Sequence, residues 1–427
     1  MGYPPGAMKS DATILQMCIL FGGLSLLTLV ACGNEEAPEV AAPLVPACDY
    51  GEDPLDRRGR LARSESWMYQ LAELDEDIAV DALAASEYPL LVIESGRNHK
   101  PCGTNPLREP KSGPCIERYD TEGLVDRLRQ TPSGRERLLL AYVDIGQAES
   151  WRDYWAEDWR PPTASGPGNP PFILSDDPDG WSDNYVVAYW DPAWQHIWLS
   201  PDGIIATLAH LGFDGVYLDW VEAYDDPRVM EVAAAQGRNP SVDMIQFIQQ
   251  ISAIGRAISP GFLVVQQNAN YLYAGLELPA RSACVDGIAA EDTWYFGDGA
   301  AEDWEAGAPD YGYTIADRIA CEAANCKTAL TGLDNVCLEE ERLDAEACAE
   351  FAVSGGLHGG ERHGFFWSTA DRLASFEAFR AAGMPIFTAD YCLDPEQAQF
   401  VYAEARAAGV VPLVTRVTLS QMTETPP

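Results

Sequence analysis

Positive charge is scarce in this chain, which has 28 lysine and arginine residues against 66 aspartate and glutamate residues, for a formal net charge of −38. Such an acidic protein repels nucleic acid and anionic lipid and attracts cations. The small basic cluster of Arg57, Arg58 and Arg60 is outweighed by the acidic residues around it. The composition therefore excludes a nucleic-acid partner, and it fits either a cationic substrate or a general need for solubility.

The sequence motifs of several common chemistries are also missing. No G-x-G-x-x-G or phosphate-binding loop is present, and no serine lies in a G-x-S-x-G context. Dinucleotide binding and acyl transfer therefore have no support. The cysteines include no close CxxC pair, and His358 and His363 lie in a glycine-rich patch without the spacing of metal ligands. We therefore predict no metal and no cofactor.

Long apolar runs are absent after residue 30, and the one before it spans about 17 residues, 14–30, which is short for a membrane span. It ends in Leu29-Val30-Ala31-Cys32, which is similar to the lipobox of bacterial lipoproteins. The pattern predicts a signal peptide over 1–31, a lipid on Cys32 and a flexible linker over 32–60. Glycine rather than aspartate after Cys32 favours the outer membrane, with membrane contact only through the lipid. An ordinary signal peptide or an uncleaved anchor is the alternative.

Nine cysteines remain after Cys32, and export to an oxidising compartment predicts about four disulfides and one free thiol. Cys102 and Cys115 would close a short loop, so this pair is the first disulfide that we predict. Cys321, Cys326, Cys337 and Cys348 share one segment and can pair among themselves.

Apolar, β-branched runs alternate with helical patterns from residue 88 onward. Such alternation predicts a parallel sheet covered by helices. Eight repeats favour an α/β fold of the (β/α)8 TIM-barrel type over residues 61–427, expected as a monomer, rather than a doubly wound sheet. More than ninety residues between Glu291 and Pro385 predict an enlarged loop region after strand six. The expected strands are 88–94, 137–145, 185–190, 215–219, 262–267, 285–289, 385–388 and 410–415.

Carboxylates and aromatic residues follow these strands at the ends where a barrel carries its catalytic groups. Aromatic rings stack on sugar faces while carboxylates bind hydroxyl groups, so the combination suits a carbohydrate. Glu94, Asp144, Asp219, Glu291 and Asp390 supply the carboxylates, with Tyr142, Trp220, Trp294 and Tyr391 among the rings.

Five segments resemble the barrel of glycoside hydrolase family 114, whose enzymes are endo-α-1,4-polygalactosaminidases. They are AYVDIGQAESWRDYW (141–155), YWDPAWQ (189–195), GFDGVYLDWVEAY (212–224), QNAN (267–270) and GIAAEDTWYF (287–296). The resemblance implies that Asp219 and Glu291 are the catalytic pair. Glu94 stands where the family usually has aspartate, and the loop after strand six is enlarged; both differences bear on the substrate.

The two lines of reasoning predict a retaining glycoside hydrolase that cleaves an α-linked amino-sugar polysaccharide, possible substrates including cationic, galactosamine-rich polymers. Asp219 would be the nucleophile and Glu291 the acid/base. A polysaccharide-binding surface lipoprotein without catalysis, and a hydrolase of another α-glycan, are the alternatives. The substrate-binding residues predicted are Tyr142, Asp144, Glu149, Arg152, Trp220, Asn268, Trp294, Asp390 and Tyr391.

Overall fold

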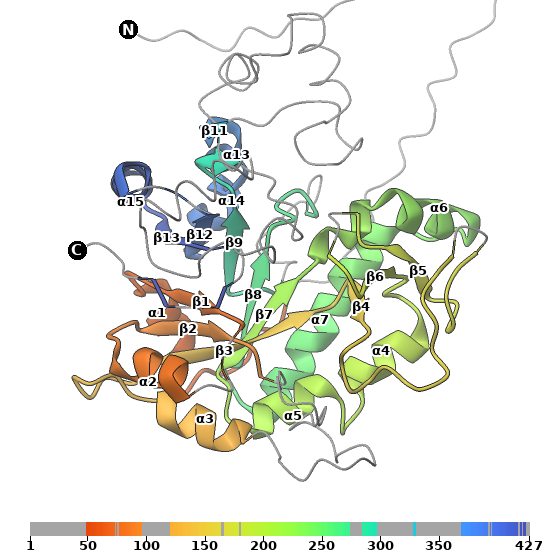
Figure 1. Cartoon of the computed structure of the whole chain (residues 1–427), viewed down its shortest axis with the longest axis horizontal. Helices are drawn as coiled ribbons and strands as arrows, with labels where there is room; N and C mark the ends of the chain where they lie inside the picture. The colour runs from red at the N-terminus through yellow and green to blue at the C-terminus, as the bar shows by residue number, and fades with distance from the viewer. Residues whose placement is uncertain are drawn as a thin grey trace, which may run out of the picture. The chain divides into compact units, whose positions relative to one another are not determined.

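A computed structural model describes residues 48–95, 120–273, 284–296, 328–329 and 369–423, with gaps at 73, 75–76, 164–165, 179–180, 392, 394, 417–418 and 421. Within these ranges, eight parallel strands form one sheet in the order β1-β2-β3-β7-β8-β9-β12-β13 (Figure 1). The strands are β1 (Met68–Gln70), β2 (Leu90–Ile93), β3 (Leu138–Asp144), β7 (Gly215–Asp219), β8 (Leu263–Gln267), β9 (Gly287–Glu291), β12 (Ile386–Tyr391) and β13 (Val411–Thr415).

The segment that follows β13 brings the two outer strands of this sheet together. The backbone N–H groups of Leu71 and Ala72, just after β1, donate to the Leu419 carbonyl at 2.8 and 3.0 Å. The Gln70 side chain donates to the Ser420 carbonyl at 3.0 Å. The sheet is thus nearly closed, and the prediction of a (β/α)8 barrel is confirmed.

Helices alternate with the strands and begin at residues suited to helix N-termini. In α7, Asn239 accepts a hydrogen bond from Val242 N, and Pro240 occupies the first turn, where its missing N–H costs nothing. This helix buries Phe247, Ile248 and Ile251 on one face. The described helices are α1 (Arg57–Ala62), α2 (Asp77–Ala85), α3 (Thr121–Leu128), α4 (Pro192–Leu199), α5 (Ile204–His210), η1 (Val221–Asp225), α6 (Pro227–Ala235), α7 (Pro240–Ile258), α13 (Thr369–Ser375), α14 (Glu377–Ala381) and α15 (Pro395–Ala408).

Aromatic rings fill the interior of the barrel. The ring of Tyr69 lies 5.0 Å from that of Tyr217 and 6.3 Å from that of Tyr142, and Trp67 lies 5.6 Å from Phe387. Because β1 pairs with neither β7 nor β12, these contacts cross the inside of the sheet. The interior is therefore a packed core, on which the side chains at the strand ends rest.

One predicted strand was wrong and one strand of the barrel was missed, so the total of eight was still right. The true first strand, β1, is only three residues long and contains the polar Gln70, so it gave no apolar run. The predicted strand 185–190 instead belongs to a separate antiparallel sheet of order β4-β6-β5, inserted after β3. We call it the insert sheet; it consists of β4 (Gln147–Glu149), β5 (Ile173–Asp176) and β6 (Asn184–Val187).

The predicted linker over 32–60 was wrong from Cys48 onward, because this segment packs on the barrel. The Arg57 guanidinium lies 2.9 Å from Asp214 and also bonds Ser259, and both Arg57 and Asp214 are buried. Cys48 forms a disulfide with Cys284, just before β9. Long-range ionic contacts and a covalent bridge thus fix a segment whose composition suggested flexibility.

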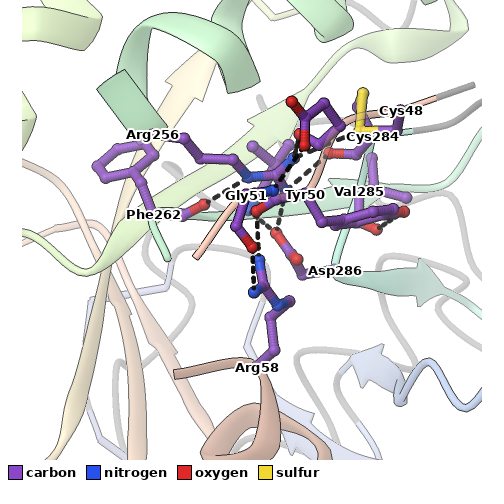
Figure 2. Close-up of a disulfide and its surroundings, with 11 residues drawn as sticks. Cys48, Tyr50, Gly51, Arg58, Arg256, Phe262, Cys284, Val285 and Asp286 are labelled. Carbon is purple, nitrogen blue, oxygen red and sulfur yellow. Dashed lines mark hydrogen bonds and ion pairs between the residues drawn. A yellow bond between two sulfur atoms is a disulfide. The ribbon is translucent and has the colours of Figure 1, made fainter. Parts of the chain in front are cut away.

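Cations and carboxylates surround this disulfide, as Figure 2 shows. Arg256 donates to Asp286 at 2.9 Å, lies 3.3 Å from the sulfur of Cys48 and stacks under the Tyr50 ring. Tyr50 in turn donates to the Val285 carbonyl at 3.0 Å. The N-terminal segment is therefore fixed at the end of β9 opposite to Glu291.

Replacing Cys48 and Cys284 together with serine should lower the free energy of unfolding by about 2–5 kcal/mol. The reason is that the bridge joins positions 236 residues apart and so restricts the unfolded chain strongly. Thermal unfolding measures the loss, at roughly 2 °C per kcal/mol in a large domain. An unchanged Tm in the double variant would contradict a stabilising bridge.

The other predicted disulfides, the lipidated cysteine and the enlarged loop region lie largely outside the described residues. Cys102, Cys115 and the four clustered cysteines lie there, as do Cys32 and most of the enlarged loop region. The described parts of that region are β10 (Tyr295–Phe296), which pairs with β11 (Thr328–Ala329), the short turn before β10, and the segment with α13 and α14 that leads to β12. Among the residues described, no helix is long and apolar enough to cross a membrane.

Candidate active site

Asp219 and Glu291 are the last residues of β7 and β9, two strands separated in the sheet only by β8. Parallel strands expose their carboxyl ends on the same face, so both carboxylates lie at the catalytic face of the barrel. Tyr69 and Tyr217 lie in the interior below, and both acids affect the pKa values of their phenols. Burial raises the pKa of each phenol, and the charges of Asp219 and Glu291 raise it further. The two acids therefore act on the same small volume.

Two hydrogen bonds favour the ionised form of Asp219 against the effect of burial. Tyr142 donates to one carboxylate oxygen at 2.5 Å, and the backbone N–H of Trp220 donates to the other at 2.7 Å. Burial raises the pKa of Asp219, whereas these two donors lower it. Trp220 adopts a left-handed backbone with φ of 54°, which is unfavourable for a tryptophan and is typical of active-site turns.

Glu291 is held by donors from two neighbouring strands. Gln267 and Asn268 donate to one carboxylate oxygen at 2.6 and 3.1 Å, and the Tyr391 hydroxyl donates to the other. The Asn268 side chain also accepts the backbone N–H of Glu291 at 2.9 Å. Asn268 can make both contacts because its φ of 50° turns the chain at the end of β8. The orientation of the Glu291 carboxyl is thus fixed from three sides.

The environment of Glu291 raises its pKa to near neutral pH. Burial raises its pKa to about 7, and the charge of Asp219 adds to this effect. The hydrogen bonds from Tyr391 and Asn268 lower the pKa and only partly offset the burial. One carboxyl of the pair can therefore supply a proton, while strong donors stabilise the charge of the other, which is the division of roles that acid-assisted bond cleavage needs.

A second acidic group lies beside the pair and is organised by one arginine. Arg152 bonds Glu94 through two contacts of 2.8 and 2.7 Å, and bonds Glu149 at 2.6 and 3.3 Å. All three side chains are largely buried. Burial raises the pKa of Glu149 while Arg152 lowers it. A single arginine thus serves two carboxyl groups.

Asp144 is the cross-strand partner of Asp219 at the ends of β3 and β7. One of its oxygens accepts the backbone N–H groups of Gly146 and Gln147, at 3.1 and 2.8 Å. The other oxygen is buried and has no hydrogen-bond partner among the described residues. Burial, followed by the charges of Asp219 and Glu149, raises the pKa of Asp144 well above its usual value. The environment of Asp144 therefore favours its protonated form.

Replacing Asp144 with asparagine should stabilise the protein at neutral pH. The raised pKa means that the stability contributed by the protonated Asp144 is complete below the unfolded pKa of about 3.9 and is lost as pH rises toward the folded value. Asparagine keeps the acceptor oxygen and has no such loss.

Thermal unfolding at several pH values tests this expectation. The Tm of the asparagine variant should exceed that of the wild type by roughly 2 °C or more at pH 7, which corresponds to about 1 kcal/mol. This difference in Tm should vanish below about pH 4. Asp144→Ala, which lacks the acceptor, should be less stable than both. A lower Tm for Asp144→Asn at pH 7 would show that the Asp144 charge is needed.

The other predicted site residues lie at the same face. Asp390, buried at the end of β12, accepts the backbone N–H of Trp294 at 2.8 Å, and Trp294 itself is buried. Trp220 packs half-buried against the core, with its backbone bound to Asp219. Asp390 and Trp294 thus shape the turn after Glu291, whereas Tyr142, Asn268 and Tyr391 contact the two central carboxylates directly.

Three residues of the site were not among the predicted ones. Tyr69 was missed together with the short β1, and Gln267 was noted as a strand end without a role. Arg372, in α13, donates to the Glu291 carbonyl at 3.4 Å, and no sequence motif marks it. Burial lowers its pKa, and nearby acids, Asp292 first, oppose that effect. Contacts of this kind depend on the tertiary structure alone.

The described residues contain no group of three or more histidine, cysteine, aspartate or glutamate side chains that could hold a metal ion. The two carboxyl groups at the ends of strands four and six are available for acid–base chemistry on a substrate bound at this face of the barrel.

The family model of glycoside-hydrolase family GH114 matches residues 116–426, and the chain belongs to this family. The protein is accordingly a glycoside hydrolase, and its substrate class is a glycan.

Relatives of the chain occur in bacteria and archaea. An uncharacterized protein of Deinococcus radiodurans is 27% identical over 406 residues, which are 93% of this chain and 96% of the relative. The uncharacterized protein MJ1477 of Methanocaldococcus jannaschii is 29% identical over 54% of this chain and 57% of its own length.

Two solved structures are similar to the chain at low identity. The glycoside hydrolase domain of PelA from Pseudomonas aeruginosa is 16% identical, with 83% of this chain and 96% of that domain covered and a TM-score of 0.44. Ega3 of Aspergillus fumigatus, solved in complex with galactosamine, is 14% identical, with 90% and 98% covered and a TM-score of 0.44.

Proposed function

We propose that this protein cleaves internal α-linkages of a galactosamine-rich polysaccharide with retention of configuration. The observation that carries the proposal is the pair of carboxyl groups: Glu291, whose pKa is raised to about 7, and Asp219, whose charged form the hydrogen bonds from Tyr142 and Trp220 favour. Family membership supports hydrolysis of a glycosidic bond. The resemblance to polygalactosaminidases supports the linkage and the sugar.

The reaction would take two steps on these two carboxyls. Asp219 attacks the anomeric carbon while Glu291 gives its proton to the departing glycosidic oxygen, so a glycosyl ester forms on Asp219. The ionised Glu291 then takes a proton from water, whose oxygen attacks the same carbon and releases Asp219. Gln267, Asn268 and Tyr391 hold Glu291 through both steps, because each can donate to either protonation state.

The charge around the pair supports an amino sugar as substrate. Glu94 and Glu149 share a single arginine, and the charge of Asp177, which accepts a hydrogen bond from Gln147, raises the pKa of Asp219. This surplus of negative charge favours the binding of a protonated amine, whereas it does not favour the binding of a neutral or anionic sugar.

Partly deacetylated galactosaminogalactan is the substrate that tests the proposal. The protein without residues 1–31 should release oligomers of several lengths, detected by mass spectrometry, with an initial product of α-configuration by NMR. Fully acetylated polymer should be cleaved more slowly, because it lacks the ammonium groups. Binding of the polymer without any release of oligomers would instead indicate a polysaccharide-binding protein.

We also propose that the protein is a bacterial lipoprotein, anchored to the outer membrane through Cys32. The apolar run and the following Leu-Val-Ala-Cys support this location. In a bacterial host, Cys32→Ala should abolish labelling by a fatty-acid analogue and release the protein from the membrane fraction. Retention of that variant after carbonate washing would refute the lipid anchor.

A further inference from the structure

Two tryptophans next to strands of the insert sheet are exposed to solvent: Trp151 follows β4, and Trp181 precedes β6. Trp151 has an exposed fraction of 48% and Trp181 of 44%, whereas Trp67, Trp194 and Trp294 are buried. A large aromatic side chain in water gives up the free energy that burial would supply. Exposed aromatic rings close to a catalytic site are therefore candidates for contact with a ligand.

Both tryptophans lie at the same end of the β4–β6 pair. Glu149 pairs with Asn184 in this ladder, and the next residue, Ser150, contacts Asp183 through its backbone and through its hydroxyl, both at 2.9 Å. Trp151 follows directly. The backbone of Trp181 is bound to Asp177, which accepts a bond from Gln147 of β4. Hydrogen bonds thus hold both tryptophans at one edge of the insert sheet.

Trp151 is joined to the catalytic face through Arg152. The guanidinium carbon lies 4.0 Å from the centre of the Trp151 ring, within the range of a cation–π contact. The same guanidinium is held by Glu94 and Glu149, so it cannot move away. One face of the indole therefore rests on a fixed support, and its exposed surface lies on the remaining side.

The charge of this edge is strongly negative. Asp176 and Asp183 are exposed on it, and after burial their charges are what raise the pKa of Tyr185. Asp183 precedes Asn184, the cross-strand partner of the buried Glu149. A ligand with repeated positive charges and flat apolar faces fits such a row of rings and acids.

We propose that the insert sheet carries a distal sugar subsite, in which Trp151 stacks on a pyranose ring of a poly-amino-sugar chain and Trp181 contacts a ring farther along. The acids of the same edge bind the ammonium groups. This subsite rests on the proposed function for its substrate, because the bound chain is the part of the polymer beyond the bond that Asp219 and Glu291 cleave. Its role is to hold long chains.

Kinetics on galactosamine oligomers of increasing length test the subsite. Trp151→Ala should raise KM for long oligomers about tenfold, the size expected for loss of one stacked ring, and the effect should shrink as the chain shortens. Trp181→Ala should matter only for the longest oligomers. Phe400→Ala is the matched control, since this aromatic is similarly exposed, at 43%, on α15. That variant should behave as the wild type at every length.

Binding to an inactive enzyme separates this proposal from the proposed function. In an Asp219→Asn background, the binding of long oligomers should be measurable by tryptophan fluorescence. Adding Trp151→Ala should weaken the affinity for these oligomers about tenfold. If the enzyme cleaves no amino-sugar polymer but this difference is found, the subsite stands and the proposed function fails.

Three results would overturn the subsite. They are an equal loss on all chain lengths, no loss at all, or the same loss for Phe400→Ala. Trp151→Phe, which keeps an aromatic ring over Arg152, should recover most of the affinity. Equal Tm values for these variants would show that the loss does not come from unfolding.

Discussion

Asp219→Asn should reduce kcat/KM by about four orders of magnitude or more, the usual cost of removing a nucleophile. Asparagine has nearly the shape of aspartate but no negative charge, so it cannot form the glycosyl ester. Its amide oxygen can still accept the Trp220 N–H, and the Tyr142 hydroxyl can turn to accept from the amide nitrogen. The variant should therefore fold normally.

The measurement is a rate assay on an activated aryl glycoside, with and without azide. Azide should restore part of the activity of Asp219→Asn and give a glycosyl azide of inverted configuration, because it replaces the carboxylate. Tyr142→Phe is the companion variant: it keeps Asp219 but removes its donor, and its loss should be far smaller. Full activity of Asp219→Asn would exclude it as the nucleophile.

The carboxylates at the strand ends could be predicted from the sequence because their signal is local. Asp219 and Glu291 each end a short apolar run, and the fold places every such end on one face. The parallel sheet follows from the same runs. Family resemblance then distinguished this pair from the other acids, which the pattern alone treats alike.

The contacts that give these acids their properties could not be predicted in the same way. Arg152 meets Glu94 across 58 positions, and Cys48 meets Cys284 across 236, so no periodicity connects them. Strand 185–190 was misplaced because β6 is largely buried, as a central parallel strand would be. A three-residue strand such as β1 has too few residues for its pattern to differ from chance.

The pH dependence of Glu291 gives the second large effect. A general acid must carry its proton, and a pKa of about 7 leaves Glu291 half protonated at neutral pH. In the wild type, kcat/KM should fall as pH rises through about 7, because Glu291 then ionises. The charge of Asp219 raises this pKa, so the Glu291 pKa measured by NMR in the Asp219→Asn variant should be lower.

Glu291→Gln should remove this alkaline limb and lower the rate on the natural polymer by about 10²–10⁴. Its amide oxygen can accept from Gln267 and Asn268, while the amide nitrogen faces Tyr391, whose hydroxyl can turn to accept. The fold should therefore survive. An aryl glycoside with a good leaving group needs no proton, so its cleavage should suffer less in the first step.

The product formed in azide decides between the two roles. With Asp219 intact, Glu291→Gln still forms the glycosyl ester, and azide attacks it without needing a base. The resulting glycosyl azide therefore keeps the configuration of the substrate, because two inversions have occurred. A glycosyl azide of inverted configuration from Glu291→Gln would instead make Glu291 the nucleophile. In that case the proton donor would be Asp219, against the hydrogen bonds from Tyr142 and Trp220 that stabilise its anion.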